Sequence, residues 1–290
     1  MDRKPLDVTA YSMMVLLTAL WGFQQVTIKV IAGDVSLIAQ AAIRSIVATA
    51  LVLAWARLRG IPLFERDGTL KAGLLAGFLF AVEFVFIYGG LAYTNASRMV
   101  VFIYLTPVLT ALGLHFVVPS ERLHPGQWLG VLVAFGGVAL AFFNSGQNTL
   151  LGDLCGVAAA FLWSATTVLI RATRLAQASA TKTLFYQLGM SAALLPIFSF
   201  LLKEPGITSL TPLALASLAY QGVLVAFASY LAWFWLLGRY LAARLSVFSF
   251  LAPMFGVVFG VWLLGEPLSP QFAVAAGLVA LGIVLVNLRR

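Results

Sequence analysis

The chain has 290 residues, of which 62% are hydrophobic and only 10% are charged, where a soluble domain carries about 25% charged residues. This composition excludes an ordinary soluble protein and indicates an integral membrane protein. The formal net charge of +8 requires no nucleic-acid partner, because membrane proteins keep their basic residues on the cytoplasmic side, next to anionic lipid.

Apolar segments of about 20 residues, long enough to cross ~30 Å of hydrocarbon as helices, recur ten times along the chain. In chain order they lie near Tyr11 to Val30, Leu37 to Ala56, Lys71 to Ala92, Met99 to Val118, Trp128 to Phe143, Leu154 to Leu169, Leu184 to Leu202, Leu213 to Leu237, Leu245 to Leu264 and Phe272 to Leu288. The connections between them are short. The sequence therefore predicts an all-α protein of ten transmembrane helices with no soluble domain.

The distribution of cations predicts the orientation of these helices. If the amino terminus is cytoplasmic, most of the 18 lysines and arginines fall in inner segments, and only Lys29, Arg98 and Lys203 fall in outer ones. This asymmetry predicts that both termini are cytoplasmic. The first apolar segment is too long for the core of a cleaved signal, so we expect it to be retained.

The two halves of the chain repeat one another. The stretch ASRMVVFIYL, which begins at Ala96, returns as AARLSVFSFL from Ala242. The matched positions are Arg98 with Arg244, Pro107 with Pro253, Trp21 with Trp163, and Lys29 with Arg171. We therefore expect two five-helix repeats, residues 1–146 and 147–290. Because five is odd, the second repeat enters the bilayer inverted, as in many secondary transporters.

Motifs for enzymatic chemistry are missing from the sequence. It contains no Gly-x-x-x-x-Gly-Lys-Ser/Thr phosphate loop and no His-Glu-x-x-His metal motif, and His115 and His124 stand apart from cysteines and carboxylates. We expect neither an enzyme nor a cofactor or metal site.

Glu83 is the most informative polar residue at membrane depth, about eleven residues into its span and therefore roughly 16 Å from the inner surface. Ionisable residues at this depth usually face an aqueous path or a charged partner. One interpretation makes Glu83 a carboxylate that binds protons or a substrate amine. The other makes it the fixed partner of Arg44 in the second span.

The first and sixth spans carry related polar faces. Trp21, Gln24 and Gln25 share one helical face by their i, i+3, i+4 spacing. Their repeat mates are Trp163, Thr166 and Thr167. An indole beside amide or hydroxyl groups is suited to bind a small amphipathic solute. The alternative is an interfacial anchor with bonds between packed helices.

The eighth span contributes Ser229, the repeat mate of Glu83, and Trp233 one turn later on the same side. The acidic residue is thus not duplicated, and neither is Arg44, whose counterpart is Ser191. A symmetric scaffold with asymmetric polar groups predicts one substrate site. Further candidates for its lining are Tyr88, Tyr104, Tyr230 and Ser249.

Matched prolines and matched cations suggest how the site opens. Pro107 and Pro253 fall inside the fourth and ninth spans, where proline kinks a helix, and we expect matched hinges there. The gating candidates are Lys29 and Arg98 at outer ends, Arg171 and Arg244 at inner ends, and Arg44 within the second span. Charged residues at helix ends also commonly extend to the interface without any gating role.

These features together resemble the drug/metabolite transporter superfamily, specifically its ten-span, duplicated EamA-type members. The resemblance covers the whole chain and rests on the Trp21-Gly22 pair followed by Lys29, on Arg44, on the two Ala-x-Arg-to-Pro stretches, on Glu121 and Gly265-Glu266, and on Gly137 and Gly282. It implies a bacterial inner-membrane exporter whose central cavity is formed mainly by spans one, three, four, six, eight and nine. Within the group, the chain is most similar to exporters of amino acids, including aromatic ones.

The function expected from this resemblance is export of small metabolites, amino acids first, by alternating access. The alternative is a multidrug or nucleotide-sugar-like carrier of the same fold, and an intramembrane enzyme is a remote third reading. The expected partners are a small-molecule substrate and the lipid bilayer. The sequence gives no signal of oligomeric state and leaves proton coupling and facilitated efflux equally open.

Overall fold

The computed structural model describes residues 7–118, 122–143, 149–240, 248 and 251–287. Within these ranges every regular element is a helix, apart from one isolated bridge between Val35 and Ile207. The elements are α1 (Val8–Val30), α2 (Leu37–Leu58), α3 (Leu70–Gly90), α4 (Ala96–Ile103), α5 (Thr106–Val117), α6 (Pro125–Phe143), α7 (Leu150–Ala172), η2 (Arg174–Gln177), α8 (Ala180–Leu201), α9 (Pro212–Ala219), η3 (Tyr220–Ser229), α10 (Tyr230–Arg239), α12 (Leu251–Leu264) and α13 (Pro270–Asn287).

Seven helical segments in the described part of the chain are long and apolar enough to cross a membrane. They include α4 and α5 taken together as one segment, and α9 continued through η3 to Trp233. Three shorter apolar helices, Pro125–Ala141, Leu251–Leu264 and Pro270–Val286, fall at the predicted fifth, ninth and tenth spans. The all-helical membrane character is confirmed, while the count of ten spans remains a prediction.

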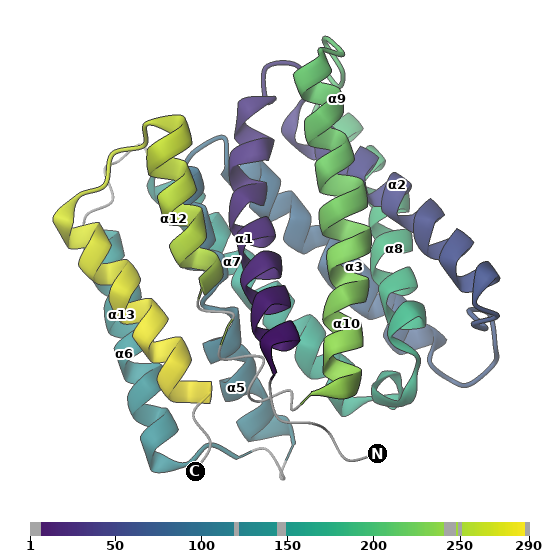
Figure 1. Cartoon of the computed structure of the whole chain (residues 1–290), viewed down its shortest axis with the longest axis horizontal. Helices are drawn as coiled ribbons and strands as arrows, with labels where there is room; N and C mark the ends of the chain where they lie inside the picture. The colour runs from purple at the N-terminus through teal and green to yellow at the C-terminus, as the bar shows by residue number, and fades with distance from the viewer. Residues whose placement is uncertain (1–6, 119–121, 144–148, 241–247, 249–250, 288–290) are drawn as a thin grey trace.

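The helices form a bundle with two ends (Figure 1). We call the end where α1 begins at Val8 and α13 finishes the proximal end, and the end where α1 finishes and α2 begins the distal end. The most extensive helix contacts pair α6 with α13, α3 with α7, α2 with α8, and α1 with α12. Each pair joins segments that lie far apart in the sequence.

Two predicted spans are not uniform α-helices. In the fourth, α4 ends at Ile103 and α5 starts afresh at Thr106, with Pro107 in its first turn. Proline is readily accommodated there, because first-turn amides have no partner within the helix. The predicted kink is thus a complete break between two helices. Pro253 lies in the first described turn of α12, and residues 249–250 before this helix lie outside the described part of the chain. In the eighth span, η3 is a ten-residue π-helix, a wider coil that is often found at functional sites.

Close helix contacts are made possible by glycine. A methyl group on Gly282 of α13 would lie 2.6 Å from the backbone nitrogen of Ala134, and one on Gly137 of α6 would lie 2.8 Å from the carbonyl oxygen of Ala275. Small residues let membrane helices approach to backbone contact. The glycines that end the predicted fifth and tenth spans therefore hold α6 against α13.

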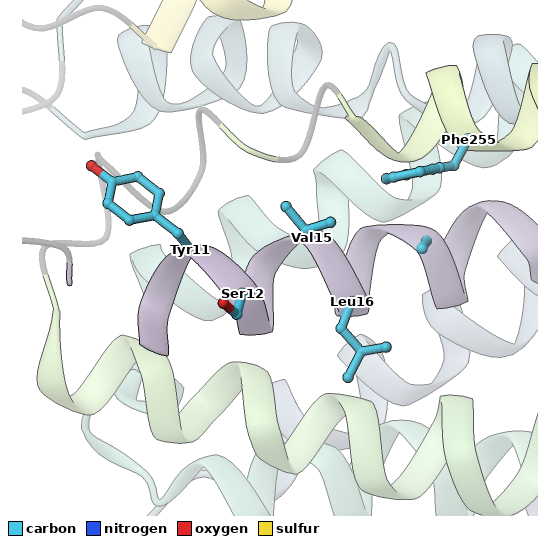
Figure 2. Close-up of a pocket in the computed structure, with 6 residues that line it drawn as sticks. Tyr11, Ser12, Val15, Leu16 and Phe255 are labelled. Atoms are coloured by element: carbon cyan, nitrogen blue, oxygen red, sulfur yellow. The ribbon is translucent and has the colours of Figure 1, made fainter. Parts of the chain in front are cut away.

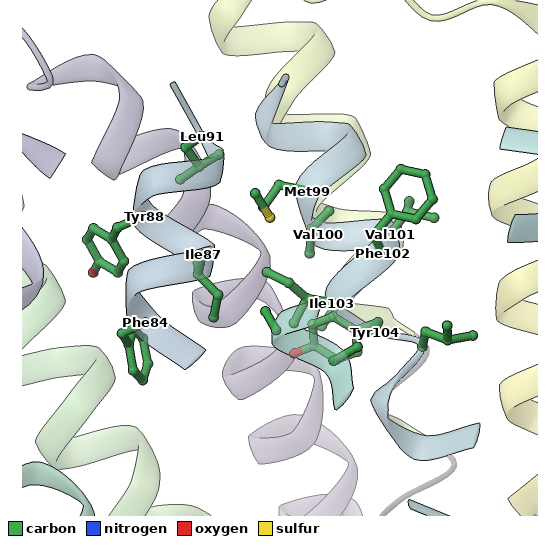
Figure 3. Packing of buried hydrophobic residues seen from close by; sticks show 14 of the residues in the cluster. Phe84, Ile87, Tyr88, Leu91, Met99, Val100, Val101, Phe102, Ile103 and Tyr104 are labelled. Carbon is green, nitrogen blue, oxygen red and sulfur yellow. The ribbon is translucent and has the colours of Figure 1, made fainter. Parts of the chain in front are cut away.

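The central core draws residues from most helices of the bundle, and Figure 3 shows the part of it formed by α3 and α4. Met99 and Ile103 of α4 extend toward α3, while Phe84 and Tyr88 of α3 point to the opposite side. All four side chains are buried. The core thus directs Phe84 and Tyr88 into the part of the bundle where the polar residues gather.

Asp67 joins the loop before α3 to the first turn of α8 at the proximal end. Its carboxylate accepts hydrogen bonds from Lys182 Nζ at 2.8 Å, from the Thr69 hydroxyl at 2.6 Å and from the Thr69 amide at 3.0 Å. These donors hold the pKa of Asp67 well below its usual range.

This shift gives a pH-dependent prediction. Because the folded-state pKa is lowered, the stabilisation is complete above the unfolded pKa of about 3.9 and is lost as the pH falls below that value. We expect Asp67→Asn to lower the midpoint of thermal unfolding by a few degrees at pH 7. The difference from wild type should shrink below about pH 4, as followed by scanning fluorimetry in detergent. A difference that stays constant between pH 7 and pH 3.5 would contradict this account.

Candidate functional site

A network of buried side-chain hydrogen bonds crosses the middle of the bundle, centred on Gln221 in the π-helical segment. The Gln221 amide nitrogen donates to Gln40 Oε1 at 3.1 Å and to Ser217 Oγ at 3.2 Å. Its Oε1 accepts from the Tyr88 hydroxyl at 2.8 Å, and Gln24 of α1 donates to the same hydroxyl at 3.5 Å. Gln221, Gln40 and Tyr88 have no exposed surface. The network therefore ties α1, α2 and α3 to the wide coil of η3.

Arg44 of α2 lies fully buried near this network. Its Nη2 donates to the Tyr230 hydroxyl at 3.1 Å, and its guanidinium carbon lies 4.2 Å from the centre of the Phe84 ring. Its Nε and Nη1 have no hydrogen-bond partner. A buried guanidinium with unused donors is strongly unfavourable unless an anion binds it.

Glu83 of α3 is 2% exposed, and its Oε2 has no hydrogen-bond partner. It interacts electrostatically with Arg44. Both Glu83 and Arg44 belong to the described residues, and no direct ion pair joins them. The acidic and the basic side chain thus lie in one buried region without a direct contact between them.

The polar faces predicted on spans one and eight come together. The Trp21 indole donates to Ser229 Oγ at 2.9 Å, and its ring meets Trp233 edge to face at a centroid distance of 5.9 Å. Gln25 is buried with its Oε1 unpartnered. The aromatic surface of this region is therefore built by α1 and the end of the eighth span.

The related face of the sixth span is arranged differently. The Trp163 ring meets Tyr104 edge to face at 6.1 Å. The hydroxyls of Thr166 and Thr167 donate to carbonyl oxygens of their own helix, at 2.9 and 3.0 Å. In this conformation the two threonines use their donors within α7, unlike the glutamines of α1.

Charged residues connect several helices at the distal end. Arg98 of α4 donates to Asp153 of α7 through Nη2 at 2.6 Å and through Nε at 3.1 Å, and also to the Ala141 carbonyl at 3.1 Å. Asp153 is fully buried and also accepts from the Thr94 hydroxyl at 2.7 Å. This bidentate pair ties α4 to α6 and α7.

Glu266, in the connection between α12 and α13, extends the distal cluster. Its carboxylate accepts from the Ala96 amide at 2.7 Å and the Ser97 amide at 2.9 Å, so it caps the start of α4. Lys29 lies 3.7 Å from the same carboxylate and donates to the Thr94 carbonyl at 2.8 Å. We call Lys29, Thr94, Arg98, Asp153 and Glu266 the distal cluster.

The remaining predicted residues fall elsewhere. Arg171 is exposed in the last turn of α7. Arg244 and Ser249 lie outside the described residues. The residues that sequence reasoning missed are Asp153, Thr94, Gln40, Gln221 and Ser217. A carboxylate in the first turn of an apolar helix was the signal that could have identified Asp153 as the partner of Arg98.

An open groove of about 570 Å³ lies beside α1, away from the polar network (Figure 2). Tyr11, Ser12, Val15 and Leu16 of α1 line it together with Phe255 of α12. Its walls are almost entirely apolar. The groove therefore offers a polar solute only the hydroxyls of Tyr11 and Ser12 and no charged group.

Comparison with known proteins identifies the family. The sequence matches the EamA-like transporter family twice, over residues 8–143 and 150–288, which together span nearly the whole chain. The chain belongs to the EamA-like transporter family. The resemblance inferred from the motifs is thereby confirmed, and a transporter function, as opposed to an enzymatic one, follows from membership.

Individual relatives of this EamA-like chain are distant but cover it fully. The "Uncharacterized transporter YoaV" of Bacillus subtilis (strain 168) is 22% identical over 277 residues, covering 94% of both proteins. The "Probable amino-acid metabolite efflux pump" of Salmonella typhimurium is 24% identical over 283 residues, 93% of this chain and 92% of that protein. The Escherichia coli (strain K12) protein of the same name is 25% identical over 284 residues, covering 93% of this chain and 90% of its own length.

A solved crystal structure has the same fold. It superposes with a TM-score of 0.68 at 22% identity, over 96% of this chain and 97% of its own. At this identity the likeness establishes the architecture of the EamA-like chain and nothing about its substrate.

Proposed function

We propose that this EamA-like transporter exports amino acids, including aromatic ones, and related small metabolites across the bacterial inner membrane. The observation that carries the proposal is the buried polar and aromatic region to which both halves contribute. Arg44, Glu83 and Tyr88 come from the first half, and Gln221 and Tyr230 from the second. The names of the Salmonella and Escherichia coli relatives agree with it.

The proposed architecture is two inverted five-helix repeats, residues 1–146 and 147–290, giving ten spans. The double family match supports the division. Helix contacts support the twofold relation, because α2 packs on α8, α6 on α13 and α4 on α12, each a pair of repeat mates. Two helices related by a twofold axis contact each other only where both lie beside that axis.

The proposed mechanism is alternating access. With cytoplasmic termini, the distal cluster closes the outer mouth, and the polar region beneath it is shielded from solvent. Rocking about the break that precedes Pro107, and about Pro253 in the matching repeat position, would separate the distal cluster and open that mouth. The substrate-binding set is then Trp21, Gln24, Gln25, Glu83, Tyr88, Tyr104, Trp163, Thr166, Thr167, Ser229, Tyr230, Trp233 and Ser249, with Lys29, Arg44, Arg98, Arg171 and Arg244 as gating residues.

Purified protein in liposomes tests the function. We expect counterflow of labelled phenylalanine, tryptophan or threonine into liposomes loaded with the same amino acid. Empty liposomes and liposomes treated with a non-specific ionophore serve as controls. Exchange of bulky organic cations or sugar nucleotides with no exchange of amino acids would replace the proposal by the multidrug or nucleotide-sugar alternative.

Thiol labelling tests the inverted topology. Cys155 is the only native cysteine, so Cys155→Ser gives a thiol-free background. Exposed Glu65, after the second predicted span, and exposed Leu210, after the seventh, occupy equivalent connections of the two repeats. We expect a membrane-impermeant maleimide to label Leu210→Cys in intact cells and Glu65→Cys only after permeabilisation. Labelling of both from the same side would refute the inversion.

A further inference from the structure

The buried polar atoms that lack hydrogen-bond partners form a restricted set. Among the described residues they are Gln25 Oε1, Arg44 Nε, Arg44 Nη1, Glu83 Oε2 and Ser191 Oγ. Ser191 belongs to α8, which packs against both α2 and α3, the helices of Arg44 and Glu83. Unsatisfied groups of opposite charge in the same packed group of helices indicate a site built for something that carries both charges.

Arg44 is held in a fixed orientation by the Tyr230 hydroxyl on Nη2 and by the Phe84 ring against its face. A guanidinium carries five N–H donors in a planar arrangement suited to carboxylates. The donors on Nε and Nη1 are unused. The side chain is thus positioned in advance and keeps the capacity to bind a carboxylate.

Glu83 provides the complementary charge. Its unpartnered Oε2 can accept a hydrogen bond from an ammonium group, and it attracts Arg44 without touching it. A simple cation would neutralise Glu83 and leave Arg44 unpaired, and a simple anion would do the reverse. A molecule with ammonium and carboxylate groups on one carbon would satisfy both.

We infer that Arg44 and Glu83 together recognise the zwitterionic backbone of an α-amino acid, Arg44 binding the carboxylate and Glu83 the ammonium. This inference rests on the proposed export function and specifies its substrate class. Because the recognised groups are common to all α-amino acids, Arg44 and Glu83 select α-amino acids as a class. The surrounding aromatic residues would contact the substrate side chain.

Competition in the counterflow assay tests the inference with three solutes of one shape. Phenylalanine carries both charges, 2-phenylethylamine lacks the carboxylate, and 3-phenylpropionate lacks the ammonium. We expect phenylalanine to inhibit at a concentration about 30-fold or more below that of either analogue, because loss of one partner from a buried charged hydrogen bond is strongly unfavourable. Equal inhibition by all three solutes would overturn the inference.

Substitution of Arg44 and substitution of Glu83 should each remove the preference for a different charged group of the solute. Arg44→Gln is expected to weaken inhibition by phenylalanine about 30-fold and to leave inhibition by 2-phenylethylamine unchanged. Glu83→Gln should weaken inhibition by phenylalanine to a similar extent and leave inhibition by 3-phenylpropionate unchanged. Arg59→Gln and Glu65→Gln make the same charge changes at exposed positions and should alter nothing. If both variants lost inhibition by all three solutes to the same extent, the two residues would only maintain the structure and would not bind the charged groups of the substrate.

Two further comparisons keep the outcomes distinct. If Arg44→Gln does not fold, Arg44→Lys retains the charge without the planar donor set, and the wild-type competition series decides by itself. Wild-type liposomes that exchange no amino acid would refute the proposed function. Exchange of phenylalanine without the predicted charge pattern would refute the zwitterion site alone.

Discussion

Asp153→Asn is expected to open the distal end of the bundle. Arg98 is 7% exposed and Asp153 is fully buried, and they form a bidentate pair. Removing one charge leaves the other uncompensated, which costs about 3–5 kcal/mol in a buried setting. In an open conformation water would solvate Arg98. The closed population should therefore fall relative to the open one by a factor on the order of 10² to 10³.

A reporter thiol beneath the cluster measures this shift. Ser97 is 2% exposed at the start of α4, and Ser97→Cys changes its size little. In the Cys155→Ser background, Asp153→Asn should raise the rate at which an impermeant maleimide labels Cys at position 97 from the distal side. An unchanged labelling rate would contradict a closing role for the pair.

Two matched variants separate this effect from general damage. Asp67→Asn removes the carboxylate charge of the Lys182 pair at the opposite end and should leave labelling at position 97 unaltered. The double variant Arg98→Leu, Asp153→Leu replaces both charges with apolar side chains, which is often close to neutral for a buried pair. Its labelling rate should return toward that of the parent protein.

The apolar runs predicted the helices well, because each run has the number of residues that a helix needs to cross the bilayer. The first predicted span, Tyr11 to Val30, corresponds to α1 at Val8–Val30, and the second, Leu37 to Ala56, to α2 at Leu37–Leu58. The break before Pro107 and the π-helix of η3 were not predicted in form. Both depend on which neighbouring groups satisfy the displaced backbone, and local sequence does not encode those neighbours.

Repeat and depth identified candidate residues that contact one another in the structure, and their role in binding substrate stays a prediction. Contacts that depend on the rotation of each helix about its axis were missed. Trp21, Ser229 and Trp233 were expected to share one region, and they make direct contact. Gln221 was missed because it belongs to none of the spaced polar faces or repeat matches by which residues such as Gln24 and Ser229 were identified. Its role becomes visible only when packing brings Tyr88 and Gln40 against it.

Gln221→Leu is expected to be the most destabilising single substitution in the central network. The leucine would leave the Tyr88 hydroxyl without its acceptor and Gln40 Oε1 without its donor, both fully buried. Each unsatisfied buried group costs about 1–3 kcal/mol, so we expect the two together to lower the free energy of unfolding by about 2–6 kcal/mol. In detergent, the midpoint of thermal unfolding should fall by several degrees.

The choice of control determines what this result means. Gln177→Leu makes the same change on the exposed η2 helix and should leave the midpoint almost unaltered. Gln221→Glu stays neutral when buried away from water, so it keeps an acceptor for Tyr88 and one O–H donor in place of the two amide donors to Gln40 and Ser217. Its midpoint should fall between those of wild type and Gln221→Leu. Equal midpoints for Gln221→Leu and Gln177→Leu would mean that η3 is held by apolar packing. The amide network would then not stabilise the π-helical coil that leads into Tyr230, the hydrogen-bond partner of Arg44.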